Sequence, residues 1–318
     1  MKPAAAADTC ASVLSTVADT VIVDDDVLAT LLTTILADGH VLLEDVPGTG
    51  KTLTAQSLAT ALNLDFNRIQ FTPDLLPADI TGTHVFDQDT GVFQFREGPL
   101  FANIVLADEI NRAPPKTQAA LLEAMGEGQV SVGEETRQLP DPFVVLATQN
   151  PVEQEGTFEL PEAQRDRFMT KTAMGYPDRE GELELLARRS DRASSEPEAT
   201  PVTDRETLGE LLAVPEQVAV HPELQAYIVD LARATREDDR VAVGISPRGI
   251  QRLFEASRAR AVLAGREYVV PEDITNTVHE TFEHRLVLTT EASVRETSKA
   301  AIVNDAVESV PVPAMDEL

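Results

Sequence analysis

Hydrophobic and polar positions divide the chain into two parts. Up to about residue 176, short apolar runs alternate with stretches of helical periodicity. The runs that predict buried strands are residues 40–45, 65–71, 103–109, 143–149 and 170–176. Continuous apolar runs of this length, interleaved with helices, are typical of a mostly parallel sheet covered on both faces. The first part is therefore expected to be an α/β domain.

Two segments of this first part alternate between apolar and polar residues instead. Residues 83–95 alternate around Asp-Gln-Asp-Thr-Gly, and residues 129–139 alternate around Gly-Glu-Glu. Alternation on both sides of such turn signals predicts a β-hairpin. Both segments lie between core elements, so we expect two hairpin insertions.

The second part has mainly helical signals. Residues 189–202 are polar and contain proline, which predicts a linker. Thr203 with Glu206 matches a capping box, and Ser246 stands before a proline that suits the first turn of a helix. We expect an α/β domain over residues 1–188 and an all-α domain over residues 203–318.

The charge balance narrows the choice of partners. The chain of 318 residues has 54 acidic against 26 basic residues, a net charge of −28. Such a field repels nucleic-acid phosphates at long range, so nucleic acid is not an expected partner. An acidic, lysine-poor surface favours a halophilic source, because salt screens the self-repulsion. An acidic docking face for a basic partner is the competing explanation.

The sequence also indicates where the protein works. No run approaches the roughly 18 apolar residues of a membrane span, and the first residues lack the apolar block of an export signal. We expect a cytoplasmic protein without membrane insertion. Cys10 is the only cysteine, which excludes an intramolecular disulfide and a thiolate-rich metal site.

A candidate phosphate-binding loop follows the first predicted strand in the stretch LLEDVPGTGKT, residues 42–52. The usual pattern is G-x-x-x-x-G-K-[ST], in which backbone N–H groups surround the phosphates. Gly50, Lys51 and Thr52 match this pattern, but Asp45 replaces the leading glycine. The order of strand, glycine loop and helix supports nucleotide binding, so we expect altered loop geometry with retained binding.

Two later strands end in candidate catalytic side chains. Residues 103–109 end in Asp108 and Glu109, and residues 143–149 are followed by Asn150. Adjacent carboxylates at a strand end beside a phosphate loop suit Mg²⁺ binding by Asp108 and activation of the attacking water by Glu109. Asn150 could orient that water or contact the γ-phosphate.

Long blocks of the sequence resemble the MoxR family of AAA+ ATPases. The blocks are LLEDVPGTGKT, FTPDLLPADITG, REGPLFANIVLADEINRAPPKTQAALLEAM, FVVLATQNPVEQEGTFELPEAQRDRFM and SPRG, in the family's order over residues 35–290. The resemblance implies a P-loop AAA+ domain with a five-stranded parallel sheet of order 5-1-4-3-2 and a C-terminal all-α lid. It also implies a ring, usually hexameric, with ATP between neighbouring copies.

The resemblance assigns roles by position. Glu109 would be the catalytic carboxylate of Walker B, Asn150 sensor 1 and Arg248 sensor 2. Arg167 would be the arginine finger, with Arg165 as its rival. The ligands of Mg²⁺ would be Thr52 and Asp108, and ATP would be bound by Pro47, Gly48, Thr49, Gly50, Lys51, Thr52 and Leu53.

The family resemblance implies ATP hydrolysis coupled to remodelling, maturation or metal insertion in partner proteins, among them proteins with von Willebrand factor A domains. A helicase-like motor is an alternative because such motors share the hairpin insertions, but the net charge of −28 opposes it. An ATP-sensing scaffold with little turnover is a third hypothesis, which Glu109 and Arg167 disfavour. The five histidines lack metal-ligand spacing, so Mg²⁺ is the only metal expected.

Overall fold

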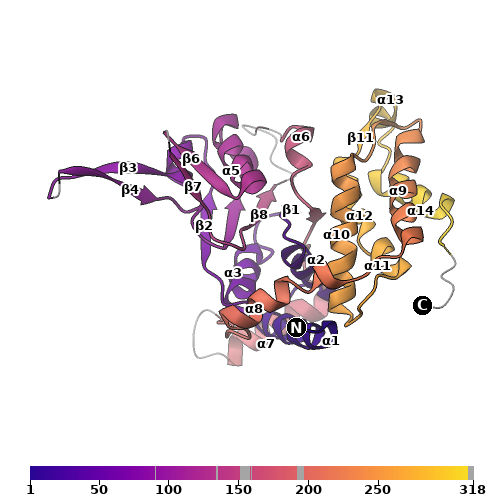
Figure 1. Ribbon diagram of the computed structural model, residues 1–318, viewed down its shortest axis with the longest axis horizontal. Coiled ribbons are helices and arrows are strands. Elements are labelled where there is room, and N and C mark those ends of the chain that lie inside the picture. Colours follow the sequence, from indigo (N-terminus) through magenta and orange to yellow (C-terminus); the bar gives the residue numbers. More distant parts are fainter. Residues whose placement is uncertain (90, 134, 151–157, 159, 192–196, 314–318) are drawn as a thin grey trace.

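A five-stranded parallel sheet forms the centre of the first domain (Figure 1). The computed structural model describes residues 1–318 except 90, 134, 151–157, 159, 192–196 and 314–318. The strands lie in the order β2 (Phe66–Gln70), β5 (Ile104–Asp108), β8 (Val144–Gln149), β1 (Val41–Glu44) and β9 (Thr170–Thr172). Numbered along the chain among themselves, they give the order 5-1-4-3-2. The expected AAA+ sheet is confirmed.

Alternating side chains of the strands enter two separate cores, because successive residues of a strand point to opposite faces. Leu43 and Leu106 belong to the core that is formed with α1 (Pro3–Thr20), α2 (Asp25–Leu36) and α3 (Lys51–Ala61). Leu42 and Val105 belong to the core that is formed with α5 (Pro115–Glu127). The central strands β1, β5 and β8 are therefore buried on both faces, as their apolar runs predict, whereas the edge strand β2 is only partly buried.

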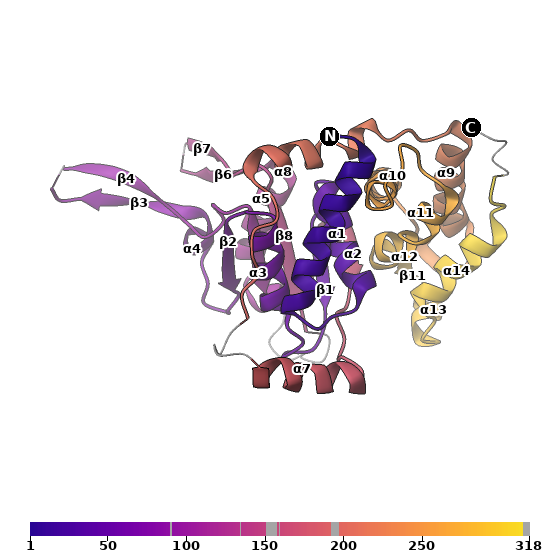
Figure 2. The ribbon, with the colours of Figure 1, turned by 90° about the horizontal axis from the view of Figure 1, so that it is seen from below.

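Both expected hairpins are present. The first follows α4 (Pro77–Thr81), consists of β3 (Gly82–Asp87) and β4 (Val92–Glu97), and projects as a long arm away from the body (Figures 1 and 2). The second consists of β6 (Gln129–Val132) and β7 (Glu135–Gln138) and follows α5. Arg137 of the second hairpin lies 4.3 Å from the ring centre of Phe95 in the first. The two insertions are therefore neighbours.

The C-terminal part forms the lid on the opposite side of the core from the long arm (Figure 1). Its helices are α9 (Pro222–Glu237), α10 (Pro247–Leu263), α11 (Pro271–Thr275), α12 (Val278–Phe282), α13 (Thr290–Val294) and α14 (Lys299–Ser309). In the chain, α6 (Glu162–Arg165) precedes β9 of the core, and α7 (Arg179–Asp191) and α8 (Arg205–Leu212) lie between β9 and the lid helices. The buried side chains of α10 share one core cluster with those of α1 and α2. The lid is thus packed against the core.

The lid differs in two details from the all-helical expectation. Two short strands, β10 (Val241–Val243) and β11 (Val287–Leu288), pair antiparallel within it. The predicted capping box at Thr203 is wrong, since Asp204 caps α8 by accepting a hydrogen bond from the N–H of Thr207. Thr203 instead donates its hydroxyl to the carbonyl of Leu62, 2.9 Å away. The Thr203 side chain, which the local pattern predicts to cap a helix, makes a tertiary hydrogen bond instead.

The single cysteine of the chain, Cys10, lies in α1. Cys10 is buried on the inner face of α1, and burial raises the pKa of its thiol to about 12. A thiol with such a pKa stays protonated and unreactive at neutral pH. None of the helices that the structure describes is long and apolar enough to span a membrane.

Candidate functional site

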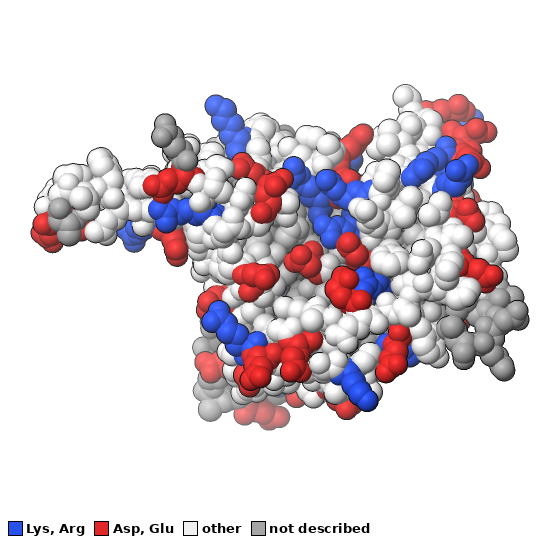
Figure 3. Space-filling view, in the orientation of Figure 1, with Lys and Arg blue, Asp and Glu red and all other residues white. Residues whose placement is uncertain are grey.

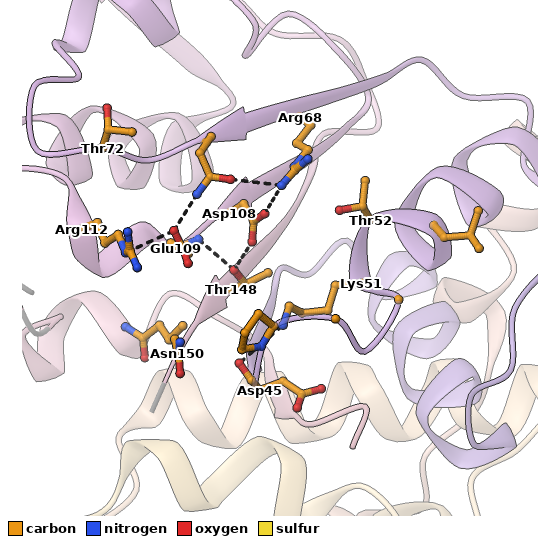
Figure 4. Close-up of a pocket in the computed structure, with 16 residues that line it drawn as sticks. Asp45, Lys51, Thr52, Arg68, Thr72, Asp108, Glu109, Arg112, Thr148 and Asn150 are labelled. Atoms are coloured by element: carbon orange, nitrogen blue, oxygen red, sulfur yellow. Dashed lines mark hydrogen bonds and ion pairs between the residues drawn. The ribbon is translucent and has the colours of Figure 1, made fainter. Parts of the chain in front are cut away.

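A cavity of about 750 Å³ opens at the carboxyl ends of β1, β5 and β8 (Figure 4). Ligands of open α/β sheets bind at this edge, where loops leave parallel strands. The cavity brings together most of the predicted site residues. Its lining includes Pro47, Gly48, Gly50, Lys51, Thr52, Leu53, Asp108, Glu109 and Asn150.

The loop between β1 and α3 has the backbone form of an anion cradle. Gly48 and Gly50 both have φ of 89°, a left-handed conformation that glycine adopts without strain. Gly50 is the N-cap of α3, so the first N–H groups of that helix face the cavity, where a helix end favours negative charge. Lys51 Nζ lies 2.6 Å from the carbonyl oxygen of Val46. An anion in this loop would therefore compete with a backbone carbonyl for the lysine.

The two predicted catalytic carboxylates lie side by side at the end of β5. Glu109 has φ of 56°, which is uncommon for a residue with a side chain and typical of functional sites. Thr148 of β8 holds the pair, since it donates its hydroxyl to Asp108 Oδ1 at 2.6 Å and accepts the Glu109 N–H at 2.8 Å. The neighbouring strand thus fixes both residues.

Three further side chains contact the carboxylates and were missed by sequence reasoning (Figure 4). Arg68 of β2 donates to Asp108 Oδ2 at 2.6 Å, and Gln70 of the same strand donates to Glu109 Oε2 at 2.7 Å. The Arg112 Nε lies 3.2 Å from the same Glu109 oxygen. Arg68 and Gln70 are two residues apart, so the alternation of β2 places them on one face. That spacing was the available signal.

The oxygen donors of this site suit Mg²⁺. Thr52 supplies a hydroxyl and Asp108 a carboxylate, and Mg²⁺ commonly takes one or two protein oxygens together with substrate phosphates and water. Over the described part of the chain, no cluster of three or more His, Cys, Asp or Glu residues could hold a metal by itself. The residues therefore fit an ion shared with phosphate, provided that Arg68 releases Asp108 Oδ2.

A second, smaller cavity of about 250 Å³ adjoins the first along the phosphate loop. Gly48, Gly50 and Leu53 line both cavities, whereas Thr49 lines only the smaller one. The walls of the smaller cavity are mostly apolar and include Val21, Ile22, Leu53, Pro177 and Leu185. Its size and chemistry suit a flat, largely apolar group next to the phosphates.

Two predicted catalytic arginines lie outside the larger cavity. Arg167 is half-buried, and its Nη1 donates to the carbonyl of Leu122 in α5. Arg248 at the start of α10 lies 3.5 Å from Asp166 and is 53% exposed. The rival Arg165 has a buried Nε without a hydrogen-bond partner among the described residues. The structure therefore places the arginines beside the junction of core and lid.

Asp166 is the centre of this junction. Its Oδ1 accepts from Arg285 Nε at 3.0 Å and from the Ser246 hydroxyl at 3.3 Å, and its Oδ2 faces Arg248. Arg285 also donates to the carbonyls of Phe168 and Met169, at 2.6 and 3.0 Å. The lid is thus bound by hydrogen bonds to the segment of the core that contains Arg165 and Arg167.

Comparison with known proteins agrees with this geometry. A family model described as the ATPase family associated with various cellular activities (AAA) matches residues 40–170, and an AAA lid domain model matches residues 233–306. Chaperone MoxR1 of Mycobacterium tuberculosis is 42% identical over 92% of this chain and 79% of its own length. The chain belongs to the MoxR family of AAA+ ATPases.

Other relatives support the same family. Protein MoxR of Methylorubrum extorquens is 34% identical over 93% of both chains, and the uncharacterized protein YeaC of Bacillus subtilis is 48% identical over 91% of this chain and 90% of its own. The crystal structure of a putative ATPase from Cytophaga hutchinsonii matches with a TM-score of 0.91 and 39% identity, covering 98% of this chain and 97% of that one. As a MoxR-family member, the protein is an ATPase that hydrolyses ATP.

Proposed function

We propose that the protein is a Mg²⁺-dependent MoxR-type ATPase in which ATP occupies both cavities. The triphosphate would lie in the larger cavity against the first turn of α3, and the base in the smaller apolar one. The convergence of Lys51, Asp108 and Glu109 at one sheet edge carries this proposal. Mg²⁺, when bound by Thr52 and Asp108, would neutralise charge on the phosphate oxygens.

In this proposal, Glu109 accepts a proton from the attacking water. Gln70 donates to one of its carboxylate oxygens, so the other oxygen can face the water. The Thr148 hydroxyl fixes the backbone at Glu109, which keeps the carboxylate at the strand end. Asn150, from the lining of the same cavity, orients the water or the γ-phosphate.

The remaining charge would come from a neighbouring copy. Arg167 and Arg248 lie outside the cavity of their own chain and beside the core–lid junction. Several basic side chains gather near this junction (Figure 3). Lys299, whose pKa is lowered by burial, lies within range of the charges of Arg165 and Lys171 and also of the acidic Glu44 and Glu162. In a protein of net charge −28, a basic face suits contact with the bound phosphates of the next copy. A hexameric ring would provide that contact at each interface.

We further propose that hydrolysis remodels partner proteins. The long hairpin exposes Val85, Phe86, Val92 and Phe93 near its tip, with exposed fractions of 46–68%. Apolar side chains on a projecting arm suit contact with a polypeptide and offer little to a nucleic-acid backbone. A chaperone-like action agrees with the name of the mycobacterial relative. Proteins with von Willebrand factor A domains remain a predicted class of clients, and the cytoplasm the predicted location.

Replacement of Glu109 by glutamine tests the proposed chemistry. The variant keeps the size of the side chain but loses its basicity, so turnover should fall by about 10²–10⁴-fold while ATP remains bound. Turnover is measured as phosphate release in molar KCl, with and without Mg²⁺, because salt screens the acidic surface. Glu127→Gln, at an exposed position at the end of α5, is the matched control. Equal rates in the two variants would contradict the role of Glu109.

A further inference from the structure

Asp45 replaces the leading glycine of the phosphate loop, and its carboxylate has a definite set of partners. Oδ1 accepts the N–H of Val46 at 2.8 Å, and Oδ2 accepts the N–H groups of Met174 and Gly175, both at 3.1 Å. The residue is only 6% exposed. Lys51 approaches the backbone carbonyl of Asp45, at 3.4 Å, and its stronger bond is to Val46. The carboxylate therefore serves the loop and the segment after β9.

That segment leads directly to a wall of the smaller cavity. Residues 173–178 connect β9 to α7, and Pro177 and Leu185 line the cavity. No side chain of α7 is buried, so apolar packing contributes little to its position. Polar contacts help to hold it, among them the hydrogen bond from Arg188 to the carbonyl of Ala18 in α1. The bonds to Asp45 fix the chain just before α7.

A glycine at position 45 could not make these contacts. Both carboxylate oxygens act as acceptors, each toward a different part of the chain. An asparagine would keep one acceptor but turn an NH₂ group toward an N–H donor on the other side, which leaves that donor unpaired. A carboxylate is thus the side chain that can join the two parts.

We propose that Asp45 is a positioning residue for the nucleotide. Its carboxylate connects the phosphate loop to the β9–α7 segment by hydrogen bonds. It thereby sets the distance between the triphosphate site and the side of the smaller cavity that contacts the base. The inference depends on the proposed function, in which one nucleotide spans both cavities. It assigns a role to the residue by which the loop departs from the usual phosphate-binding pattern.

Removal of Asp45 changes both a charge and a set of hydrogen bonds, and these two changes have opposite effects on ligand binding. A carboxylate lines the larger cavity, so its loss would by charge alone strengthen the binding of any polyphosphate. Loss of the hydrogen bonds from Val46, Met174 and Gly175 to Asp45 instead weakens the binding of ligands that need both cavities. ADP and inorganic tripolyphosphate separate these effects, because only ADP carries a base.

The experiment compares the affinities of the wild type, Asp45→Gly and Asp45→Asn for ADP and for tripolyphosphate by titration calorimetry with Mg²⁺. We expect both variants to bind ADP about tenfold more weakly, a loss of about 1.4 kcal/mol, while the affinity for tripolyphosphate changes less than about threefold. In the same variants, the amides of Met174 and Gly175 should exchange hydrogen faster than in the wild type. If Asp45→Gly does not fold, the affinities of Asp45→Asn for ADP and tripolyphosphate are compared with those of the wild type alone.

Asp273→Asn in the lid is the matched control. Its carboxylate is likewise buried, with 3% exposed, and accepts a backbone N–H from Val270, but it lines neither cavity. This variant should bind ADP like the wild type. Equal losses for ADP and tripolyphosphate, or unchanged or tighter binding of ADP, would overturn the role of Asp45. A wild type that binds ADP no better than tripolyphosphate would instead refute the two-cavity placement of the nucleotide.

Discussion

The carboxylate of Asp166 joins the core to the lid through two arginines in very different surroundings. The Arg285 side chain is 2% exposed, and its Nε lies 3.0 Å from Asp166 Oδ1. Arg248 is 53% exposed and lies 3.5 Å from Oδ2. We therefore predict that Asp166→Asn destabilises the protein far more than Arg248→Ala, although both remove the same kind of ion pair.

The burial of each ion pair of Asp166 determines how much free energy of unfolding is lost when that pair is broken. Breaking a buried pair leaves an uncompensated charge and costs about 3–5 kcal/mol. Arg285 keeps the carbonyls of Phe168 and Met169, and an asparagine can still accept from its Nε, so we expect about 2–3 kcal/mol for Asp166→Asn. The exposed pair with Arg248 contributes about 0.2–1 kcal/mol, and its long distance places it near the lower value.

Urea unfolding at fixed salt measures both changes as free energies of unfolding. Asp305→Asn is the control, since Asp305 is 57% exposed and also pairs with an arginine, Arg240. It should lose less than about 1 kcal/mol. If Arg248→Ala lowered the free energy of unfolding as much as Asp166→Asn, burial would not be what distinguishes the two ion pairs. ATP turnover should still fall in Arg248→Ala, because its proposed role concerns the neighbour's phosphates and not folding.

Three further outcomes are expected. Arg167→Ala and Lys51→Ala chains should each be inactive, yet their mixture should regain part of the turnover, because an intact pocket can meet an intact finger; no recovery would contradict sites shared between copies. Burial lowers the pKa of His40 from 6.5 to about 4, so the imidazole is neutral in both the folded and the unfolded chain above pH 6.5. As the pH falls from 6.5 toward 4, the unfolded chain binds a proton that the folded chain does not, and about 3 kcal/mol of the free energy of unfolding is lost. Urea titrations at several pH values should show this loss in the wild type and less of it in His40→Gln. Gly126→Ala should displace Arg167 and lower turnover with little change in urea stability, because the gain of up to about 1 kcal/mol in helix propensity offsets a lost hydrogen bond of similar size.

The elements that local pattern determines were predictable. The short apolar run of β5 is typical of a strand buried on both faces, and the glycines of the phosphate loop fit a turn before a helix. The order of the sheet came from the family resemblance and not from periodicity. The short pairing of β10 with β11 was missed, since each strand has two or three residues and depends on its partner in the folded lid.

The contacts of Asp108 and Glu109 show why the site was only partly predictable. The sequence predicts a strand at residues 65–71, but which of its side chains reach Asp108 and Glu109 depends on β2 lying next to β5 with Gln70 opposite Asp108. That register joins residues about 40 positions apart in the chain. The alternation of β2 predicts that Arg68 and Gln70 share a face, but it contains no information about this register, so their contacts with Asp108 and Glu109 could not be assigned.

The choice between Arg165 and Arg167 could not be made from spacing alone, and Gly126 now bears on it. A glycine inside a helix such as α5 costs about 1 kcal/mol relative to alanine. A Cβ at Gly126 would lie 2.3 Å from Arg167 Nη1, so the missing side chain makes room for this guanidinium beside its acceptor, the Leu122 carbonyl. Arg165 has no such place, since its buried Nε lacks a hydrogen-bond partner among the described residues. The helix therefore loses some stability where Gly126 makes room for Arg167. Among the described residues, the guanidinium of Arg167 has one hydrogen bond, to the Leu122 carbonyl, so it could exchange this acceptor for a neighbour's phosphate. This difference favours Arg167 as the finger.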